Sequence, residues 1–220
     1  MTAFSVVWIH ADVFINGLLI TISIGGLGII FGTLVGTGIA VFRSHVPRIE
    51  RVVRWYVDFF RAAPIVVLLI WFFYAFPLLT GFGMEAFWTA VLVLTLWLSA
   101  AMAETLRTGI EGVPAGQKEA GRALGLSEFQ ITRRVVLPQA FRSMLPLIAG
   151  LYAEQLKNTA LASIITVNEL LHVSQILISQ TYRTLEIYTT VAVLFIAMIL
   201  PLVYATRRLE SSRLSMRRPV

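Results

Sequence analysis

The chain contains several apolar stretches without a charged side chain, and the longest lies between Asp12 and Arg43. An α-helix needs about 20 mostly apolar residues to cross the hydrocarbon core of a bilayer. Three further stretches of this kind are Arg61–Glu85, Glu85–Glu104 and Glu186–Arg207. A fifth, at about 143–168, has the same apolar character but contains Glu154 and Lys157. The sequence therefore predicts an all-α fold, a polytopic membrane bundle of five transmembrane helices.

The composition agrees with a membrane protein and excludes several other classes. Of the 220 residues, 57% are hydrophobic and 14% charged, whereas soluble domains carry about a quarter charged residues. No cysteine is present, which excludes disulfides and thiolate metal ligands. His10, His45 and His172 are too far apart to form a metal-ligand pattern, so we expect neither a metal nor another cofactor. No positive segment precedes the first apolar stretch, so we expect no cleaved signal peptide.

The basic residues predict how the chain is oriented. Of its 18 Lys and Arg residues, 16 lie in three segments that five spans place on one side of the membrane. Positive residues stay on the cytoplasmic side, so we expect the N-terminus outside and the C-terminus in the cytoplasm. The exceptions are Lys157 and Arg183. Because the positive charge follows the ends of the apolar runs and forms no continuous stripe, we expect no nucleic acid partner. The three segments contain Arg43, Arg48, Arg51, Arg54 and Arg61; Arg107, Lys118, Arg122, Arg133, Arg134 and Arg142; and Arg207, Arg208, Arg213, Arg217 and Arg218.

We expect one domain over residues 1–220, because no linker divides the chain and no long repeat is evident. The first span contains Gly28, Gly32 and Gly36 at four-residue spacing. Small residues at this spacing allow two helix backbones to approach closely. The alternative is that glycine is simply more frequent in membrane helices than in soluble ones.

A charged segment at about 104–142 is predicted to form a cytoplasmic loop. Residues 116–125 suit a short helix that Gly125 terminates in a left-handed conformation. Ser127 is then expected to cap a second short helix. Ala120, Ala123 and Leu124 share one face of the first helix. Such a helix can either contact a soluble partner or lie on the anionic inner leaflet, and the residues alone do not separate these alternatives.

The same segment resembles the cytoplasmic loop of importer permeases of the ATP-binding-cassette superfamily. In those proteins the pattern reads Glu-Ala-Ala, three residues, Gly, nine residues, Ile, one residue, Leu-Pro. Gly121 replaces the second Ala of that pattern and Val135 replaces the Ile. The resemblance implies that the loop docks a separate ATPase and couples its motion to the membrane helices. The residues that match or surround the pattern, and that we expect to do this, are Gln117, Glu119, Ala120, Gly121, Ala123, Leu124, Gly125 and Pro138.

More of the chain is similar to one branch of these importers, the polar amino acid permeases of the histidine, glutamine and glutamate type. The similar runs are 58–64, 103–110, 137–142 and 156–161. The resemblance implies a permease that does not itself hydrolyse ATP, in the bacterial cytoplasmic (inner) membrane among membrane lipid. It also implies several partners: two ATPase subunits, a second identical or related permease, an extracytoplasmic substrate-binding protein, and an amino acid as substrate.

Two ionisable residues are predicted within the fourth span. Glu154 and Lys157 are three residues apart and can pair on one helix face. An ionisable group in hydrocarbon costs about 2.5–3.5 kcal/mol on insertion scales and usually faces a bundle interior or a watery cavity. The pair either positions the helix or lines a polar path together with Asn158 and Thr159. In the second case Glu154 and Lys157 could bind the two charges of an amino acid zwitterion.

Two functions of other classes are weighed against the importer. An ion-coupled secondary transporter or channel would need no ATPase, but the five spans show no inverted repeat of the kind common in such transporters. An intramembrane enzyme is the other, but neither a His-Glu-x-x-His nor a Gly-x-Ser-x-Gly pattern is present.

Overall fold

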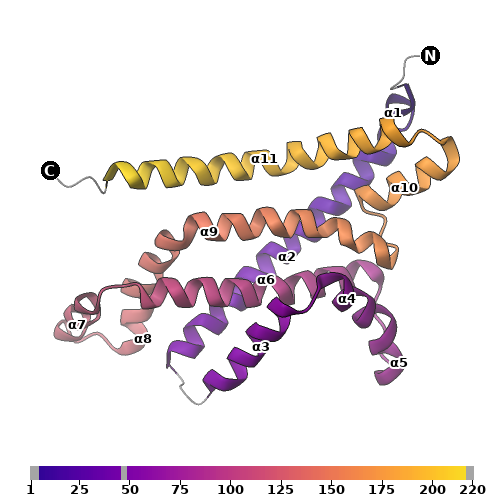
Figure 1. Ribbon diagram of the computed structural model, residues 1–220. Helices are drawn as coiled ribbons and strands as arrows, with labels where there is room; N and C mark the ends of the chain where they lie inside the picture. Colours follow the sequence, from indigo (N-terminus) through magenta and orange to yellow (C-terminus); the bar gives the residue numbers. More distant parts are fainter. Residues whose placement is uncertain (1–4, 46–48, 217–220) are drawn as a thin grey trace.

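The computed structural model describes residues 5–45 and 49–216, and every regular element in these two ranges is a helix (Figure 1). The predicted all-α fold is therefore confirmed for the described residues. In chain order the elements are α1 (Ser5–Ile9), α2 (Ala11–His45), α3 (Glu50–Ala62), α4 (Ile65–Ile70), the π-helical turn η2 (Trp71–Ala75), α5 (Phe76–Thr80), α6 (Ala86–Glu111), α7 (Ala115–Ala123), α8 (Glu128–Ile131), the π-helical turn η3 (Thr132–Val136), α9 (Leu137–Asn158), the 3-10 helix η4 (Thr159–Ile165), α10 (Leu170–Thr181) and α11 (Thr184–Met216).

The long helix α2 packs closely along α6, and its glycines make this possible. A Cβ atom on Gly32 would lie 2.8 Å from Cβ of Leu98, and one on Gly36 would lie 2.7 Å from Cβ of Met102. The space where a Cβ atom of Gly28 would lie is likewise occupied by the side chain of Gln155 from α9. Since real Cβ atoms essentially never approach below 3.0 Å, a larger residue at Gly32 or Gly36 would force α2 and α6 apart. The prediction that this glycine stripe is a helix-packing surface is confirmed.

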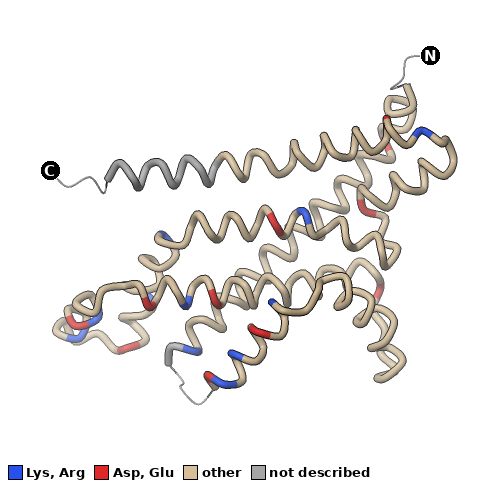
Figure 2. The backbone as a smooth tube through the Cα atoms, viewed as in Figure 1, with Lys and Arg blue, Asp and Glu red and all other residues tan. Residues whose placement is uncertain are grey.

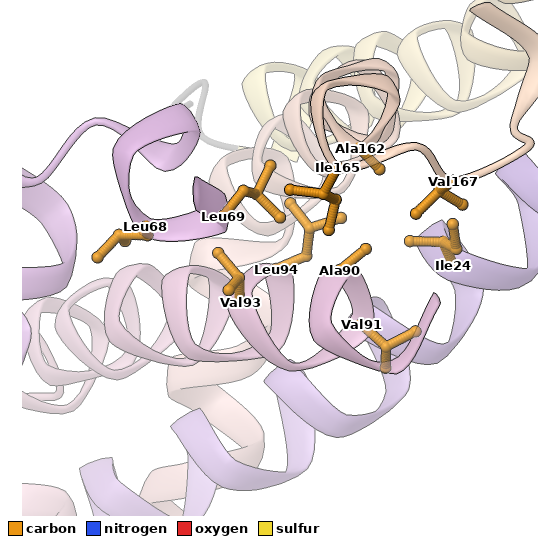
Figure 3. Close-up of a cluster of buried hydrophobic side chains, with 10 residues drawn as sticks. All are labelled: Ile24, Leu68, Leu69, Ala90, Val91, Val93, Leu94, Ala162, Ile165 and Val167. Carbon is orange, nitrogen blue, oxygen red and sulfur yellow. The ribbon is translucent and has the colours of Figure 1, made fainter. Parts of the chain in front are cut away.

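The main apolar core lies where α2, α4, α6 and η4 meet (Figure 3). Leu69 of α4, Leu94 of α6 and Ile165 of η4 are fully buried there. Burying a side chain of this size stabilises a fold by about 1.5–3 kcal/mol. The core therefore joins segments from the first and last thirds of the chain into one bundle.

The second span differs from the prediction. It was expected between Arg61 and Glu85, but the helical path already begins at Glu50 and is bent by 102° between Ala62 and Ile65. Pro64 explains the break, because proline has no N–H and disfavours the helical conformation of the residue before it. α3 packs along α6, and the hydroxyl of Tyr56 lies 2.6 Å from that of Ser99.

Three of the basic residues that were predicted to lie in a loop after the first span, Arg51, Arg54 and Arg61, therefore lie on α3. A helix with one charged face and one apolar face contains no continuous apolar run. A prediction based on such runs therefore missed α3.

The predicted loop at about 104–142 is also much shorter than expected. α6 continues to Glu111, the short helix α7 follows at Ala115–Ala123, and α8 already starts at Glu128. On α6, Arg107 forms ion pairs with Glu104 and with Glu111, each at 2.6 Å. Ion pairs between residues three and four positions apart stabilise a helix, so α6 continues past the end of its apolar run. The second short helix that Ser127 was expected to cap is the first turn of a much longer helical segment, 128–158.

Four helical segments are long and apolar enough to cross a membrane, and the bent pair α3–α5 makes a fifth if it counts as one span. The four are Ala11–Arg43, Ala86–Glu111, Glu128–Ile165 and Thr184–Tyr204. The predicted count of five is thus reached only with the bent pair. The orientation of the termini stays a prediction, and three of the arginines behind it, Arg48, Arg217 and Arg218, lie outside the described residues.

Candidate functional site

Helix α7 projects beyond the end of the bundle (Figure 1) and closes with a complete Schellman turn. The amide of Leu126 donates to the carbonyl of Gly121 at 3.1 Å, and the amide of Gly125 donates to the carbonyl of Arg122 at 2.9 Å. Gly125 has φ +74°, the left-handed conformation that favours glycine. The predicted role of Gly125 in ending this helix is confirmed.

α7 is fixed to the start of the following helix by several contacts. Ser127 and Gln130 form a reciprocal capping box at the start of α8, which confirms Ser127 as an N-cap. Arg122 donates to Glu128 at 2.6 Å, and this ion pair raises the pKa of Arg122. Gly121 is buried against Ile131 of α8.

The remaining surface of α7 is open. Ala120, Ala123 and Leu124 are exposed, and Leu124 has 80% of its surface accessible. Glu119 and Pro138 are exposed as well, and Gln117 accepts a long hydrogen bond of 3.5 Å from Gln139. With so much of its side chain exposed, Leu124 contributes little to packing within the part of the chain that the structure describes. The structure thus brings the eight predicted coupling residues together at one end of the bundle.

Charged residues gather at this same end, on α3, at the ends of α2 and α6, and around α7 (Figure 2). Arg43 donates from Nε and Nη2 to both carboxylate oxygens of Glu50, at 2.6 and 2.5 Å. It also donates to Glu104 at 3.3 Å, and Arg54 donates to Glu50 at 2.9 Å. These ion pairs join α2, α3 and α6 where the three helices meet.

A polar cavity of about 400 Å³ lies between α3, α6 and α9. Arg61 and Glu154 both line it, and neither forms an ion pair with another described residue. The sequence analysis treated Arg61 only as a loop charge. Arg61 could have been singled out from the sequence, because it lies three residues before the helix-breaking Pro64. The rest of the lining consists of Trp97, Ala101, Glu104, Thr105, Thr108, Leu147 and Leu151.

Glu154 and Lys157, which could have paired on one helix face, form none of the ion pairs among the described residues. Glu154 faces the cavity beside α3 and α6, whereas Lys157 lines a separate apolar cavity of about 480 Å³ against α11. Residues three positions apart on a helix differ by about 60° in direction, which is enough for two side chains to turn toward different neighbours.

Asn158 and Thr159 lie where α9 tightens into η4. Thr159 is buried and donates to the carbonyl of Leu156 at 2.7 Å. Asn158 is half-buried, and its Nδ2 has no hydrogen-bond partner among the described residues. Gln155, which the sequence analysis did not single out, is fully buried against Gly28, and neither its Oε1 nor its Nε2 has such a partner.

Glu169 is a second buried polar residue that the sequence analysis missed. Its carboxylate caps α10 by accepting from the amides of Leu171 and His172 at 2.9 and 2.8 Å. Burial raises its pKa to about 7, although those two hydrogen bonds act in the opposite direction. An acidic residue directly before an apolar run is a helix-start signal that could have revealed it.

Residues 14–213 match the family described as binding-protein-dependent transport system inner membrane component. The chain belongs to this family. A bacterial inner-membrane location is implied by the family and by the apolar helices.

Among its relatives, the L-cystine transport system permease protein TcyL of Bacillus subtilis is 35% identical over 185 residues, 81% of this chain and 77% of that protein. The glutamine transport system permease protein GlnP of Escherichia coli (strain K12) is 32% identical over 94% of this chain and 95% of that protein. The octopine transport system permease protein OccM of Rhizobium meliloti is 37% identical over 77% of this chain and 74% of that protein.

Solved structures show the same fold. The crystal structure of an amino acid ABC transporter with histidines gives a TM-score of 0.84 at 30% identity, covering 95% of this chain and 98% of that one. An inward-facing structure of the MetNI methionine ABC transporter gives a TM-score of 0.72 at 22% identity, covering 90% and 95% of the two chains. The latter likeness concerns the fold alone.

Proposed function

We propose that this chain is the permease subunit of an ATP-driven importer that moves a polar amino acid into the cytoplasm. The observation that carries the proposal is the projecting helix α7, whose apolar face of Ala120, Ala123 and Leu124 has no partner within the described chain. Relatives that transport glutamine, cystine and octopine support an amino acid as the substrate.

The face of α7 is the proposed docking surface for the ATPase. Gln117, Glu119, Ala120, Ala123 and Leu124 would contact the ATPase, while Gly121, Gly125 and Pro138 shape the segment that presents them. Because α7 is fixed to α8, movement of the ATPases would be transmitted into the helical segment 128–158, which also contains Glu154. The chain contributes no chemistry to ATP hydrolysis, and its link to that reaction is conformational.

The cavity beside α3, α6 and α9 is the proposed part of the substrate path. Its lining includes the carboxylate of Glu154 and the guanidinium of Arg61, and neither forms an ion pair with another residue of the described ranges. An amino acid zwitterion presents an ammonium and a carboxylate, which these two groups would bind as charge-assisted hydrogen bonds. Arg61 therefore takes the role that the sequence analysis gave to Lys157. Asn158 and Thr159, which adjoin this part of α9, stay candidates for uncharged contacts.

Several partners complete the proposed transporter. Two ATPase subunits would dock on α7 of paired permeases, which are identical or related chains. An extracytoplasmic binding protein would deliver the amino acid, and membrane lipid would surround the apolar helices. One permease subunit offers only a few helices around its polar cavity, so a second subunit is needed to enclose the path.

ATP-driven uptake into proteoliposomes tests the proposal. The permease, its ATPase and its binding protein are reconstituted, and each of the proteinogenic amino acids and L-cystine is offered from outside. We expect uptake that requires ATP. Uptake that persists without ATP while an ion gradient is held would favour an ion-coupled secondary transporter or channel and would contradict the importer.

A further inference from the structure

Helix α3 has an apolar side that is exposed. The helix lies at the edge of the bundle (Figure 1) and packs against α6 and α2, with Val57 buried. Val52, Trp55 and Phe59 lie on another side, because positions three and four apart are neighbours on a helix. They have 70%, 73% and 45% of their surface accessible. Within the described ranges, no other element covers this side of α3.

The two aromatic rings on this side form one flat surface. Trp55 and Phe59 stack with their centroids 5.7 Å apart and their planes inclined by 14°. Exposed tryptophan in a membrane protein is enriched where the hydrocarbon core meets the headgroups. α3 begins at the charged end of the bundle (Figure 2), which is the end that carries α7. The stacked rings therefore belong to the leaflet on the α7 side.

A basic residue borders the same surface. Arg51 is exposed, lies one helical turn before Trp55, and forms no ion pair with another described residue. Arg54 is exposed as well, and its Nη2 donates to Glu50 at 2.9 Å. A guanidinium has five N–H donors, so Arg54 retains donors for a second acceptor.

The charges at the start of α3 leave one positive charge in excess. The ion-pair network there is neutral, with three members of each sign: Arg43, Arg54 and Arg107, and Glu50, Glu104 and Glu111. Arg51 is additional to this network. The other acidic residue of α3, Asp58, lies seven positions further on, about 10 Å along the helix axis. The apolar side of α3 is therefore bordered by a group that attracts an anion.

The order of these groups along α3 matches a phospholipid. Arg51 and Arg54 are three positions apart, which places their Cβ atoms about 5–6 Å from each other and lets both side chains reach one phosphate. Phe59 lies about two turns further along the helix, where an acyl chain would follow its headgroup.

A second copy of the chain fits this side less well. An interface with twofold symmetry uses the same patch on both subunits, so it would bring two such excess positive charges together.

We propose that this side of α3 binds an anionic phospholipid of the leaflet on the α7 side. The phosphate contacts Arg51 and Arg54, and an acyl chain packs on the stacked aromatic pair. The site lies outside the proposed substrate path and does not depend on which substrate the chain transports. Because Glu50 pairs with Arg54 and also joins α3 to α2, the bound lipid stabilises the position of α3 in the bundle.

Photo-crosslinking in nanodiscs tests the lipid site. The full-length permease is placed in discs of phosphatidylcholine that contain a small fraction of a lipid with a diazirine in one acyl chain. This photoreactive lipid is phosphatidylglycerol in one set of discs and phosphatidylcholine with the same chains in the other. Mass spectrometry of peptic fragments measures the labelling of α3, and the ratio of the two lipids gives the headgroup preference of each variant.

The wild-type protein should prefer phosphatidylglycerol about fivefold or more, and Arg51→Gln should lower this preference about fivefold. That is the effect of one basic residue near an anionic membrane surface. Arg133→Gln is the matched control, because it removes an exposed basic residue of η3, and its preference should equal that of the wild type.

A second pair of variants tests the apolar half of the site. Trp55→Ala should lower the labelling of α3 by both lipids at least about twofold, because it removes the surface for the acyl chain. Trp88→Ala removes another exposed tryptophan, near the start of α6, and should leave the labelling of α3 unchanged.

Three results would overturn the proposal. Equal labelling of wild-type α3 by the two lipids would mean ordinary contact with the bilayer. A preference that persists in Arg51→Gln, or that Arg133→Gln lowers as much, would mean that the headgroup is selected elsewhere or by net charge. If neither lipid labels α3, another protein surface covers it.

Discussion

The contact between Gly121 and Ile131 provides the sharpest test of how α7 is held. Gly121→Ala restores the residue that is usual at this position of the importer loop. In this chain, however, the added Cβ would lie 2.8 Å from Cγ1 and 3.2 Å from Cδ1 of Ile131. Ordinary contacts lie at 3.4–4 Å. The helix or the isoleucine must therefore move by roughly 0.6–1.2 Å, and overpacking of this kind costs about 1–3 kcal/mol.

The same substitution also stabilises helix α7 itself, because alanine is favoured over glycine by about 1 kcal/mol in a helix interior. The net effect expected for Gly121→Ala is a loss of about 0–2 kcal/mol in the stability of the α7–α8 junction. Gly116→Ala is the matched control, since Gly116 lies on the same helix and a Cβ there meets nothing within 4 Å. That control should leave the junction unchanged or slightly stabilise it.

Hydrogen–deuterium exchange of the α7 peptide in the assembled transporter measures the junction, and ATP hydrolysed per amino acid imported measures coupling. We expect Gly121→Ala to speed exchange in α7 and to raise the ATP consumed per amino acid. In the background of Ile131→Ala the added methyl should cost about 1–3 kcal/mol less, because the atoms it would meet are gone. Equal exchange in Gly121→Ala and Gly116→Ala would refute the reasoning.

Three further predictions concern other parts of the chain. Glu119→Arg combined with Gly125→Pro should lower co-purification of the ATPase while membrane insertion is retained; wild-type yield of the complex would contradict the docking role of α7. Gly32→Ala should lower the thermal midpoint, because its Cβ meets Leu98, whereas Gly26→Ala, with nothing within 4 Å, should not; equal midpoints would contradict glycine packing between α2 and α6. Burial raises the pKa of Glu169 from 4.5 to about 7, so the folded state binds the proton more tightly than the unfolded state. Stability should therefore fall as pH rises between these two values and then level off, and Glu169→Gln should flatten this slope in thermal unfolding followed across pH.

The sequence by itself determined the features that depend on local chemistry. Apolar length predicts α2 and α6 because a helix that crosses hydrocarbon must be long and uncharged. Gly125 and Ser127 mark the end of one helix and the start of the next, because left-handed backbone and N-capping are properties of single residues. The four-residue spacing of glycines in α2 likewise revealed the face that packs.

Only the tertiary structure decided which polar side chains share a cavity. Arg61 and Glu154 are far apart in the chain and line one cavity because α3 and α9 both pack against α6, whereas the neighbours Glu154 and Lys157 are turned apart. The sequence analysis also missed the helix α3 before the bend at Pro64 and the extension of α6 to Glu111, because both depend on contacts with other helices or on ion pairs. Ion pairs and amphipathic packing sustain α3 and the end of α6, and neither leaves a continuous apolar run in the sequence.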